Sequence, residues 1–176
     1  MRAKSRKREP VMTPLKWTLL AAAALITIVL LVNGYYRHVQ SPLWEEERAA
    51  EKQAIETAEF TETADAHKFV WDETLWVVEG KDKDGDEAYV WLKQEDKDKP
   101  LILKVKEGVT AEAIEEQFNQ SKPDADMERV TLGMLNGEPV WEVFYYRKQA
   151  GSGNYYYDFY RFKDGSAVTT YKLPSQ

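Results

Sequence analysis

A long apolar stretch from Leu15 to Tyr36, LKWTLLAAAALITIVLLVNGYY, constrains this chain more than any other feature. Between Trp17 and Val32 it carries no charge, and its most polar side chains are threonines. The hydrocarbon core of a bilayer is about 30 Å thick, which takes about 20 apolar residues in a helix that rises about 1.5 Å per residue. The stretch therefore predicts a transmembrane helix over 15–36.

The flanks of this stretch predict its orientation. Lys16 and Trp17 at one end and Tyr35 and Tyr36 at the other are typical of membrane interfaces. Basic residues crowd the segment before the stretch, whereas only Arg37 follows it directly. Because basic residues favour the cytoplasmic side, we expect a single-pass protein of the cell membrane with a basic cytoplasmic tail over 1–14 and an extracytoplasmic C-terminal part.

A cleaved signal peptide is the alternative, since it shares the basic head and the apolar middle. The residues after the apolar run, VNGYY, do not offer a cleavage site of small residues, so an uncleaved signal-anchor is favoured. A buried core helix is disfavoured because the run shows no amphipathic stripe.

Charge excludes two classes of partner. Of the 24 basic and 30 acidic residues, six and one lie up to Tyr36, which leaves 18 basic and 29 acidic residues beyond it and a net charge of −11. Such a surface disfavours nucleic acid, whose phosphates require Lys and Arg, and it disfavours anionic lipid headgroups. The chain has no cysteine, so its fold must be stabilised by apolar burial, for which six Trp, ten Tyr and six Phe are available.

Beyond the anchor, two segments have the pattern of one helix followed by several strands. A short stem over 37–42 precedes a helix that starts near Ser41-Pro42 and continues through LWEEERAAEKQAIETAEF, with a small apolar stripe of alanines. Thr110 is a suitable N-cap for a second helix, with a stripe of Ala113, Ile114 and Phe118. Alternating apolar residues predict strands over 68–71, 74–79, 87–93, 101–106, 127–135, 139–147, 155–162 and 167–173.

The two halves are similar to each other. TLWVVEGKDKDGDEAYVWLKQ aligns with PVWEVFYYRKQAGSGNYYYDFYRF, which matches Trp76 with Trp141 and Val78 with Val143, and the Tyr89/Trp91 strand with the Tyr157/Phe159 strand. Such a repeat predicts an α+β ectodomain of two lobes over 37–106 and 107–176, each a helix packed on an antiparallel sheet. The lobes join at Lys106-Glu107-Gly108, and we expect each to have its own core rather than to share one.

This organisation resembles a known family. The anchor, the two repeats and the stretches LWVVEG (75–80), YVW (89–91), KEG (106–108) and WEV (141–143) resemble the TseB or YpmB-like membrane-anchored proteins of Gram-positive bacteria, as does YDF (157–159) with Asp164-Gly165. The resemblance covers about 15–173 and implies two cystatin-like lobes of the PepSY type. It also implies a non-enzymatic regulator of cell-wall elongation that interacts with penicillin-binding proteins. The chain departs from the family in a longer basic head and a longer connection between Asp158 and Gly165.

The residues by themselves indicate no catalytic or metal site. His38 and His67 are far apart, no cysteine is present, and no serine lies in a Gly-x-Ser-x-Gly context. Acidic pairs are too abundant to be specific for glycoside cleavage. We therefore predict no catalytic, cofactor-binding or metal-binding residue.

The acidic stretch over 82–87, DKDGDE, has two interpretations. It resembles part of a calcium loop, but the glycine is fourth rather than sixth and lysines add opposing charge. A hairpin turn explains Asp-Gly fully and is favoured, and weak calcium binding is the alternative.

The aromatic strands of the second half carry the candidate binding residues. The strand over 155–162 is aromatic on both faces, whereas a half-covered strand is polar on one. One interpretation is a strand covered on both sides or tyrosines whose hydroxyls reach water. The other is an exposed patch for a protein or glycan partner. The strands over 139–147 and 155–162 should pair as a hairpin, which gathers the partner-binding candidates Tyr145, Tyr146, Tyr155, Tyr156 and Tyr160 on one sheet surface.

Three functions follow as hypotheses. The first is a membrane-tethered regulator that contacts wall-synthesis enzymes, with a penicillin-binding protein as the implied partner. The second is a protease inhibitor or pro-domain-like module of the PepSY type. An enzyme acting on peptidoglycan is the least favoured.

Overall fold

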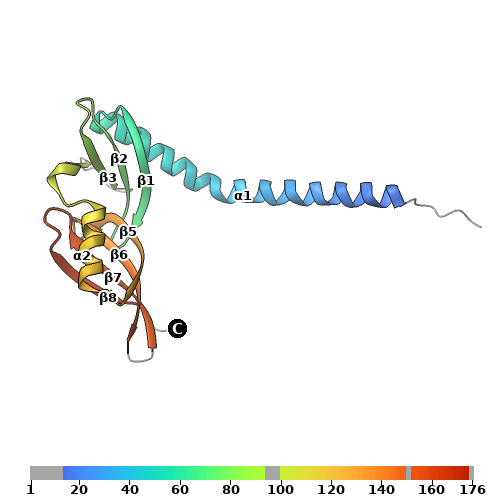
Figure 1. Ribbon diagram of the computed structural model, residues 1–176. Helices are drawn as coiled ribbons and strands as arrows, with labels where there is room; N and C mark the ends of the chain where they lie inside the picture. The colour runs from blue at the N-terminus through green and yellow to red at the C-terminus, as the bar shows by residue number, and fades with distance from the viewer. Residues whose placement is uncertain (1–13, 94–99, 150–151, 175–176) are drawn as a thin grey trace, which may run out of the picture. The chain divides into compact units, whose positions relative to one another are not determined.

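The protein is described here by a computed structural model that covers residues 14–93, 100–149 and 152–174 (Figure 1). The basic tail predicted over 1–14 lies outside the described residues except for Pro14. The chain divides into two compact units, 1–45 and 46–176. It is an α+β protein with an apolar N-terminal helix and two antiparallel sheets, as the sequence predicts.

The first helix, α1 (Pro14–Ala58), contains the predicted membrane span. Within the described residues, Leu15–Tyr36 is the segment long and apolar enough to cross a membrane, with a mean hydropathy of 2.3. The stem predicted over 37–42 is wrong, because these residues are helical and Pro42 lies inside α1. Proline removes one helical hydrogen bond, but it does not end a helix whose residues on both sides favour helix.

The first sheet is a four-stranded meander in the order β1-β2-β3-β4, with all neighbours antiparallel. Its strands are β1 (Glu62–Val70), β2 (Thr74–Lys81), β3 (Glu87–Lys93) and β4 (Leu101–Lys104), and a 3-10 turn, η1 (Val105–Glu107), follows. β1 begins at Glu62 rather than at Lys68. Its first residues are mostly polar, so they gave no apolar alternation, but they pair with β2.

The second sheet repeats this meander in the order β5-β6-β7-β8. The helix α2 (Ala111–Ser121) precedes β5 (Ala125–Leu135), β6 (Glu138–Gln149), β7 (Ser152–Arg161) and β8 (Ala167–Lys172). Thr110 caps α2 as predicted, since its hydroxyl accepts a hydrogen bond from the Ala113 amide. Ile114 and Phe118 are fully buried, whereas Ala113 is exposed and does not belong to the buried stripe.

The strand registers confirm the sequence alignment of the two halves. Trp76 lies opposite Leu92 and Trp141 lies opposite Tyr160, so the two tryptophans occupy the same place in their sheets. Trp91 lies opposite Val77, next to Trp76, and Phe159 lies opposite Glu142, next to Trp141. The strands of the first sheet, β1–β4, precede the predicted lobe boundary between residues 106 and 107, and those of the second sheet, β5–β8, follow it. The boundary itself stays a prediction.

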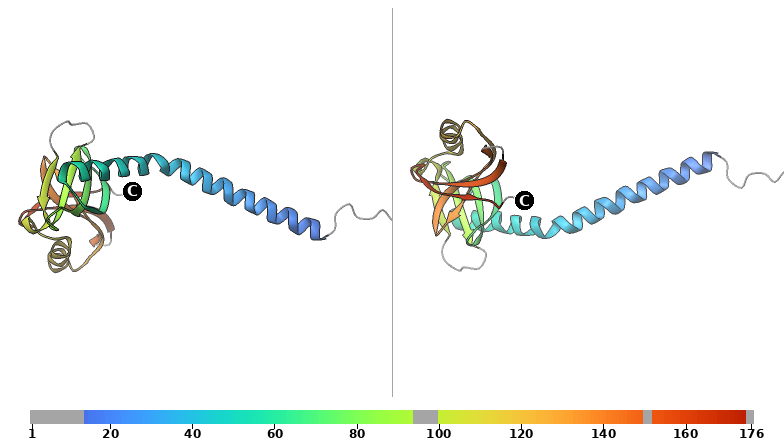
Figure 2. Two further views of the ribbon diagram at one scale, coloured as in Figure 1. Left: turned by 90° about the horizontal axis from the view of Figure 1, so that it is seen from above. Right: turned by 90° about the horizontal axis from the view of Figure 1, so that it is seen from below.

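The lobes do not have separate cores, contrary to expectation. A small cluster joins Ala50 and Ala54 of α1 to one face of the first sheet. The opposite face of that sheet joins the second sheet and α2 in one larger cluster. The cause lies in β2, whose consecutive residues from Leu75 to Val78 are all buried, so that both faces of the first sheet require a cover. The two sheets and α2 lie together in both views of Figure 2.

Candidate partner-binding face

The five candidate tyrosines lie on two opposite faces of the second sheet. β6 and β7 form the predicted hairpin, in which Tyr145 pairs with Tyr156 and Tyr146 with Tyr155. Tyr145 contacts the ring of Phe118 in α2, with ring centroids 4.8 Å apart. Because side chains alternate along a strand, Tyr145, Tyr156 and Tyr160 share the face toward α2, and Tyr146 and Tyr155 lie on the other face.

Tyr145 and Tyr160 are core residues, which corrects the expectation that the five form one exposed patch. They are 2% and 4% exposed, and both hydroxyls donate hydrogen bonds of 3.1 Å to the buried carboxylate of Asp158. Lys122 and Thr170 also donate to this carboxylate. Burial, with Asp158 beside them, raises the pKa of both tyrosines. A buried acid needs such partners, and the tyrosines supply them.

The face of the second sheet away from α2 carries a continuous set of rings, which we call the aromatic face. It comprises Trp71, Phe144, Tyr146, Tyr155, Tyr157, Phe159 and Tyr171. Phe144 stacks on Tyr155 and Tyr157, with ring centroids 5.2 and 4.8 Å apart. Tyr146 contacts Tyr155 at 5.2 Å. The rings therefore support each other across β6, β7 and β8.

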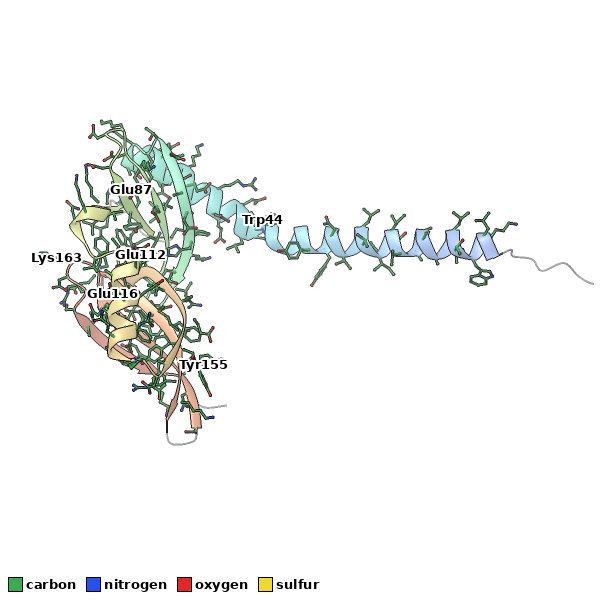
Figure 3. The ribbon with its side chains drawn as sticks, in the orientation of Figure 1. Trp44, Glu87, Glu112, Glu116, Tyr155 and Lys163 are labelled. Atoms are coloured by element: carbon green, nitrogen blue, oxygen red, sulfur yellow. The ribbon has the colours of Figure 1, made fainter. Side chains whose placement is uncertain are left out.

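One end of the aromatic face is covered by the first lobe and the other is open. Trp71, which follows β1, packs on Phe159 and Tyr157 with ring centroids 4.9 and 5.2 Å apart. At the far end, Tyr155 is 43% exposed. Tyr171 lies nearer the covered end, with its ring centroid 5.3 Å from that of Trp71, and it is also 43% exposed. Figure 3 shows Tyr155 apart from Glu112 and Glu116 of α2. Large exposed aromatic patches mark interaction sites more often than isolated apolar residues do.

An ion pair between an exposed arginine and a buried carboxylate lies beside these rings. Arg129 Nη2 donates to Oε1 of Glu142 at 3.0 Å, and its guanidinium lies over the Phe144 ring at 5.2 Å. The Glu142 side chain is 4% exposed, whereas that of Arg129 is 54% exposed. Burial raises the pKa of the Glu142 carboxyl, and Arg129 opposes this rise. The candidates predicted from the sequence do not include Arg129, Trp71, Phe144, Tyr157 or Tyr171. Tyr157 could have been predicted as a member of this face, because it is two residues from Tyr155 in the same strand and so shares its face.

A cleft of about 580 Å³ lies between the lobes and shares Arg129 with the aromatic face. Its lining includes Asp65, His67, Glu79, Glu87, Glu112 and Arg129. Burial, followed by the nearby carboxylates, raises the pKa of Glu79, and burial raises the pKa of Tyr89 to about 12. The ring of His67 contacts Asp65 and the Leu132 carbonyl, so its partners form no nucleophile–base pair. The described residues hold no cluster of metal-ligating side chains.

The acidic turn after β2 is paired with lysines. Gly85 has a φ of +81°, and the Asp82 carboxylate accepts from the amides of Asp84 and Asp86, as a turn requires. Lys104 lies 3.2 Å from the Asp82 carboxylate and 2.5 Å from that of Asp86, and Lys106 lies 2.8 Å from Asp86. These lysines compete with any cation for the carboxylates, which weakens the calcium alternative.

Comparison with known proteins agrees with this architecture. A family model described as "Cell wall elongation regulator TseB-like domain" matches residues 49–93, from the last turns of α1 through β3. The "Probable cell wall elongation regulator TseB" of Bacillus subtilis (strain 168) is 25% identical over 143 residues, which are 81% of this chain and 89% of that protein. The chain is therefore similar to the TseB/YpmB-like family in sequence and in fold.

The solved structure of the YpmB protein from Bacillus subtilis extends the likeness to the fold of the family. It superposes with a TM-score of 0.65 and 25% identity, covering 72% of this chain and 96% of that one. The family resemblance stated from short motifs is thereby confirmed. The segment that matches the TseB-like family description includes Trp71 but ends before β6–β8. Most residues of the aromatic face therefore lie outside the matched segment.

Proposed function

We propose that this chain is a non-enzymatic, membrane-anchored extracytoplasmic regulator of cell-wall elongation that contacts a penicillin-binding protein through its aromatic face. The observation that carries the proposal is the exposure of that face, on which Tyr155 and Tyr171 are each 43% exposed, in a sheet whose other face is covered by α2. Aromatic residues and arginine dominate the energetics of protein interfaces, and this face offers both.

The anchor supports the same function, because it would hold the ectodomain near wall-synthesis enzymes of the membrane. One helix, Leu15–Tyr36, is compatible with a single pass. The basic residues before it favour a cytoplasmic N-terminus and an extracytoplasmic C-terminal part. A regulator of this kind requires a surface rather than a reactive site, and the described residues present such a surface.

Site-specific photocrosslinking in intact cells tests the proposal. A photoreactive phenylalanine at Tyr155 or at Tyr171 should crosslink to a penicillin-binding protein. The same group at Glu116, exposed on α2, is the matched control and should not. Crosslinks from Glu116 but not from Tyr155 or Tyr171 would move the contact to the α2 face, and the absence of any penicillin-binding protein from all three positions would overturn the proposal.

A further inference from the structure

Arg129 lies on the aromatic face because β5 has a bulge at Glu128. Met127 pairs with Tyr145 and Arg129 pairs with Phe144, so two residues of β5 advance while one residue of β6 does. A bulge shifts the alternation of the strand, and it is a common device for redirecting a side chain. Without it, Arg129 would share the α2 face with Met127.

The guanidinium of Arg129 is held by two contacts, but only one of its N–H groups donates a hydrogen bond within the described residues. Its hydrogen-bond partner is the buried carboxylate of Glu142, at 3.0 Å from Nη2, and Phe144 lies beneath the group. A guanidinium has five N–H donors in a fixed fork. Within the described residues, the remaining donors of Arg129 have no hydrogen-bond partner, although 54% of the side chain is exposed. A fixed fork with free donors matches a carboxylate.

The ring contacts favour a protein over a sugar as the occupant. A pyranose ring stacks on a free aromatic face, but Phe144 is stacked by two tyrosines and the Arg129 guanidinium. Tyr157 is also contacted by Trp71. The hydroxyls of Tyr155 and Tyr157 have no hydrogen-bond partner among the described residues. The surface therefore offers ring edges and hydroxyls, which suit apolar and polar groups of a polypeptide.

The negative net charge of the ectodomain restricts where a carboxylate of a partner can bind. The chain beyond Tyr36 has a net charge of −11, so an approaching carboxylate is repelled by most of this surface. Arg129 offers it a local partner that is already ordered, which lowers the entropic cost of the contact.

We infer that the aromatic face binds a protein segment in which a carboxylate lies next to apolar side chains. The carboxylate pairs with Arg129, and the apolar side chains pack on Tyr155, Tyr157 and Tyr171. The inference rests on the proposed function and adds the chemistry of the partner. It predicts that recognition depends on Arg129 as well as on the rings.

Peptide selection on the intact protein tests this chemistry. The full chain, in nanodiscs of a zwitterionic lipid, is offered a random peptide library displayed on phage, with counter-selection on the Tyr155→Ser/Tyr171→Ser chain. Enriched peptides should carry Asp, Glu or a free C-terminus beside Leu, Ile, Phe or Trp. Their affinity, measured by fluorescence anisotropy, should fall by about tenfold to a hundredfold in Arg129→Gln, the loss expected for a charged hydrogen bond.

Three further variants separate recognition from folding. Arg129→Gln leaves Glu142 buried without its partner, so Arg129→Gln/Glu142→Gln is measured beside it and should lose the same affinity. Arg129→Lys keeps the charge without the fork and should lose less. Arg147→Gln removes a cation that pairs with Asp124 at 2.9 Å on the other face, and it should leave the affinity unchanged.

The outcomes distinguish this inference from the function on which it rests. Peptides without acidic groups, or unchanged affinity in Arg129→Gln and its double variant, would overturn the inference while crosslinking from Tyr155 could still support the proposed function. Selection of no peptide that depends on Tyr155 and Tyr171 would also overturn the inference. Crosslinking in cells then decides the proposed function independently.

Discussion

The indole nitrogen of Trp91 donates a hydrogen bond of 2.9 Å to the carbonyl oxygen of Gly133, which joins the first sheet to the second. The tryptophan is 1% exposed, so this contact lies deep in the cluster shared by the lobes. Beside it, the ring of Phe69 occupies the space that a side chain at position 133 would need. The junction between the lobes is therefore as closely packed as a domain core.

Gly133→Ala should destabilise the ectodomain by about 1–3 kcal/mol, because its methyl group overlaps the buried ring of Phe69. Denaturant unfolding of the full chain, followed by tryptophan fluorescence, measures the change. Lys163→Ala, at an exposed position, is the control and should change the free energy of unfolding by less than about 0.5 kcal/mol. Equal stability of Gly133→Ala and the parent would mean that Phe69 moves aside without cost.

The tyrosine substitutions should divide by face. Tyr145→Ser should cost about 3–5 kcal/mol, since it empties a core position and leaves Asp158 with one donor fewer. Tyr155→Ser should cost less than about 1 kcal/mol, because the side chain is 43% exposed. Thermal unfolding of the two variants in parallel measures the difference, and similar melting temperatures would contradict the assignment of Tyr145 to the core.

Lys122 should matter for stability through the buried carboxylate of Asp158, to which it is paired. Lys122→Met leaves that carboxylate without its cation, and breaking a buried pair in this way costs about 3–5 kcal/mol. In the double variant Lys122→Met/Asp158→Asn the buried charge is gone, so much of the loss should be recovered. A double variant as unstable as the single one would show that hydrogen bonds, not the uncompensated charge, account for the effect.

The apolar N-terminal helix, the order of the strands and the repeat could all be predicted from the sequence, because each depends on local periodicity. The register that equates Trp76 with Trp141 followed from the same pattern. The burial of Tyr145 and Tyr160 could not be predicted, because it depends on which face of the sheet α2 covers. The alternation of side chains defines two faces but does not show which one is covered. Two features gave no sequence signal: the bulge that redirects Arg129 and the packing of Trp71 on Phe159.

The predicted orientation can be tested by labelling, because the chain has no cysteine to interfere. Lys163→Cys in intact cells should react with a membrane-impermeant maleimide, since residue 163 is exposed and is expected outside the membrane. Ser5→Cys, in the basic head, should react only after the cells are permeabilised. Labelling of Ser5→Cys but not of Lys163→Cys in intact cells would reverse the orientation.

The acidic turn should show a measurable pH dependence. Hydrogen bonds from Lys104 and Lys106 lower the pKa of the Asp86 carboxyl to about 2, below the value of about 3.9 in an unfolded chain. Because the folded pKa is the lower one, these contacts stabilise the fold above about pH 4, and this contribution is lost as the pH falls toward 2. In Lys104→Gln the pKa of Asp86 should rise, whereas Lys172→Gln, far from the turn in sequence, should leave it unchanged. Carbon-13 NMR of the Asp86 carboxyl follows the titration directly, and an ordinary aspartate pKa in the parent protein would show that the lysines do not pair with this turn in solution.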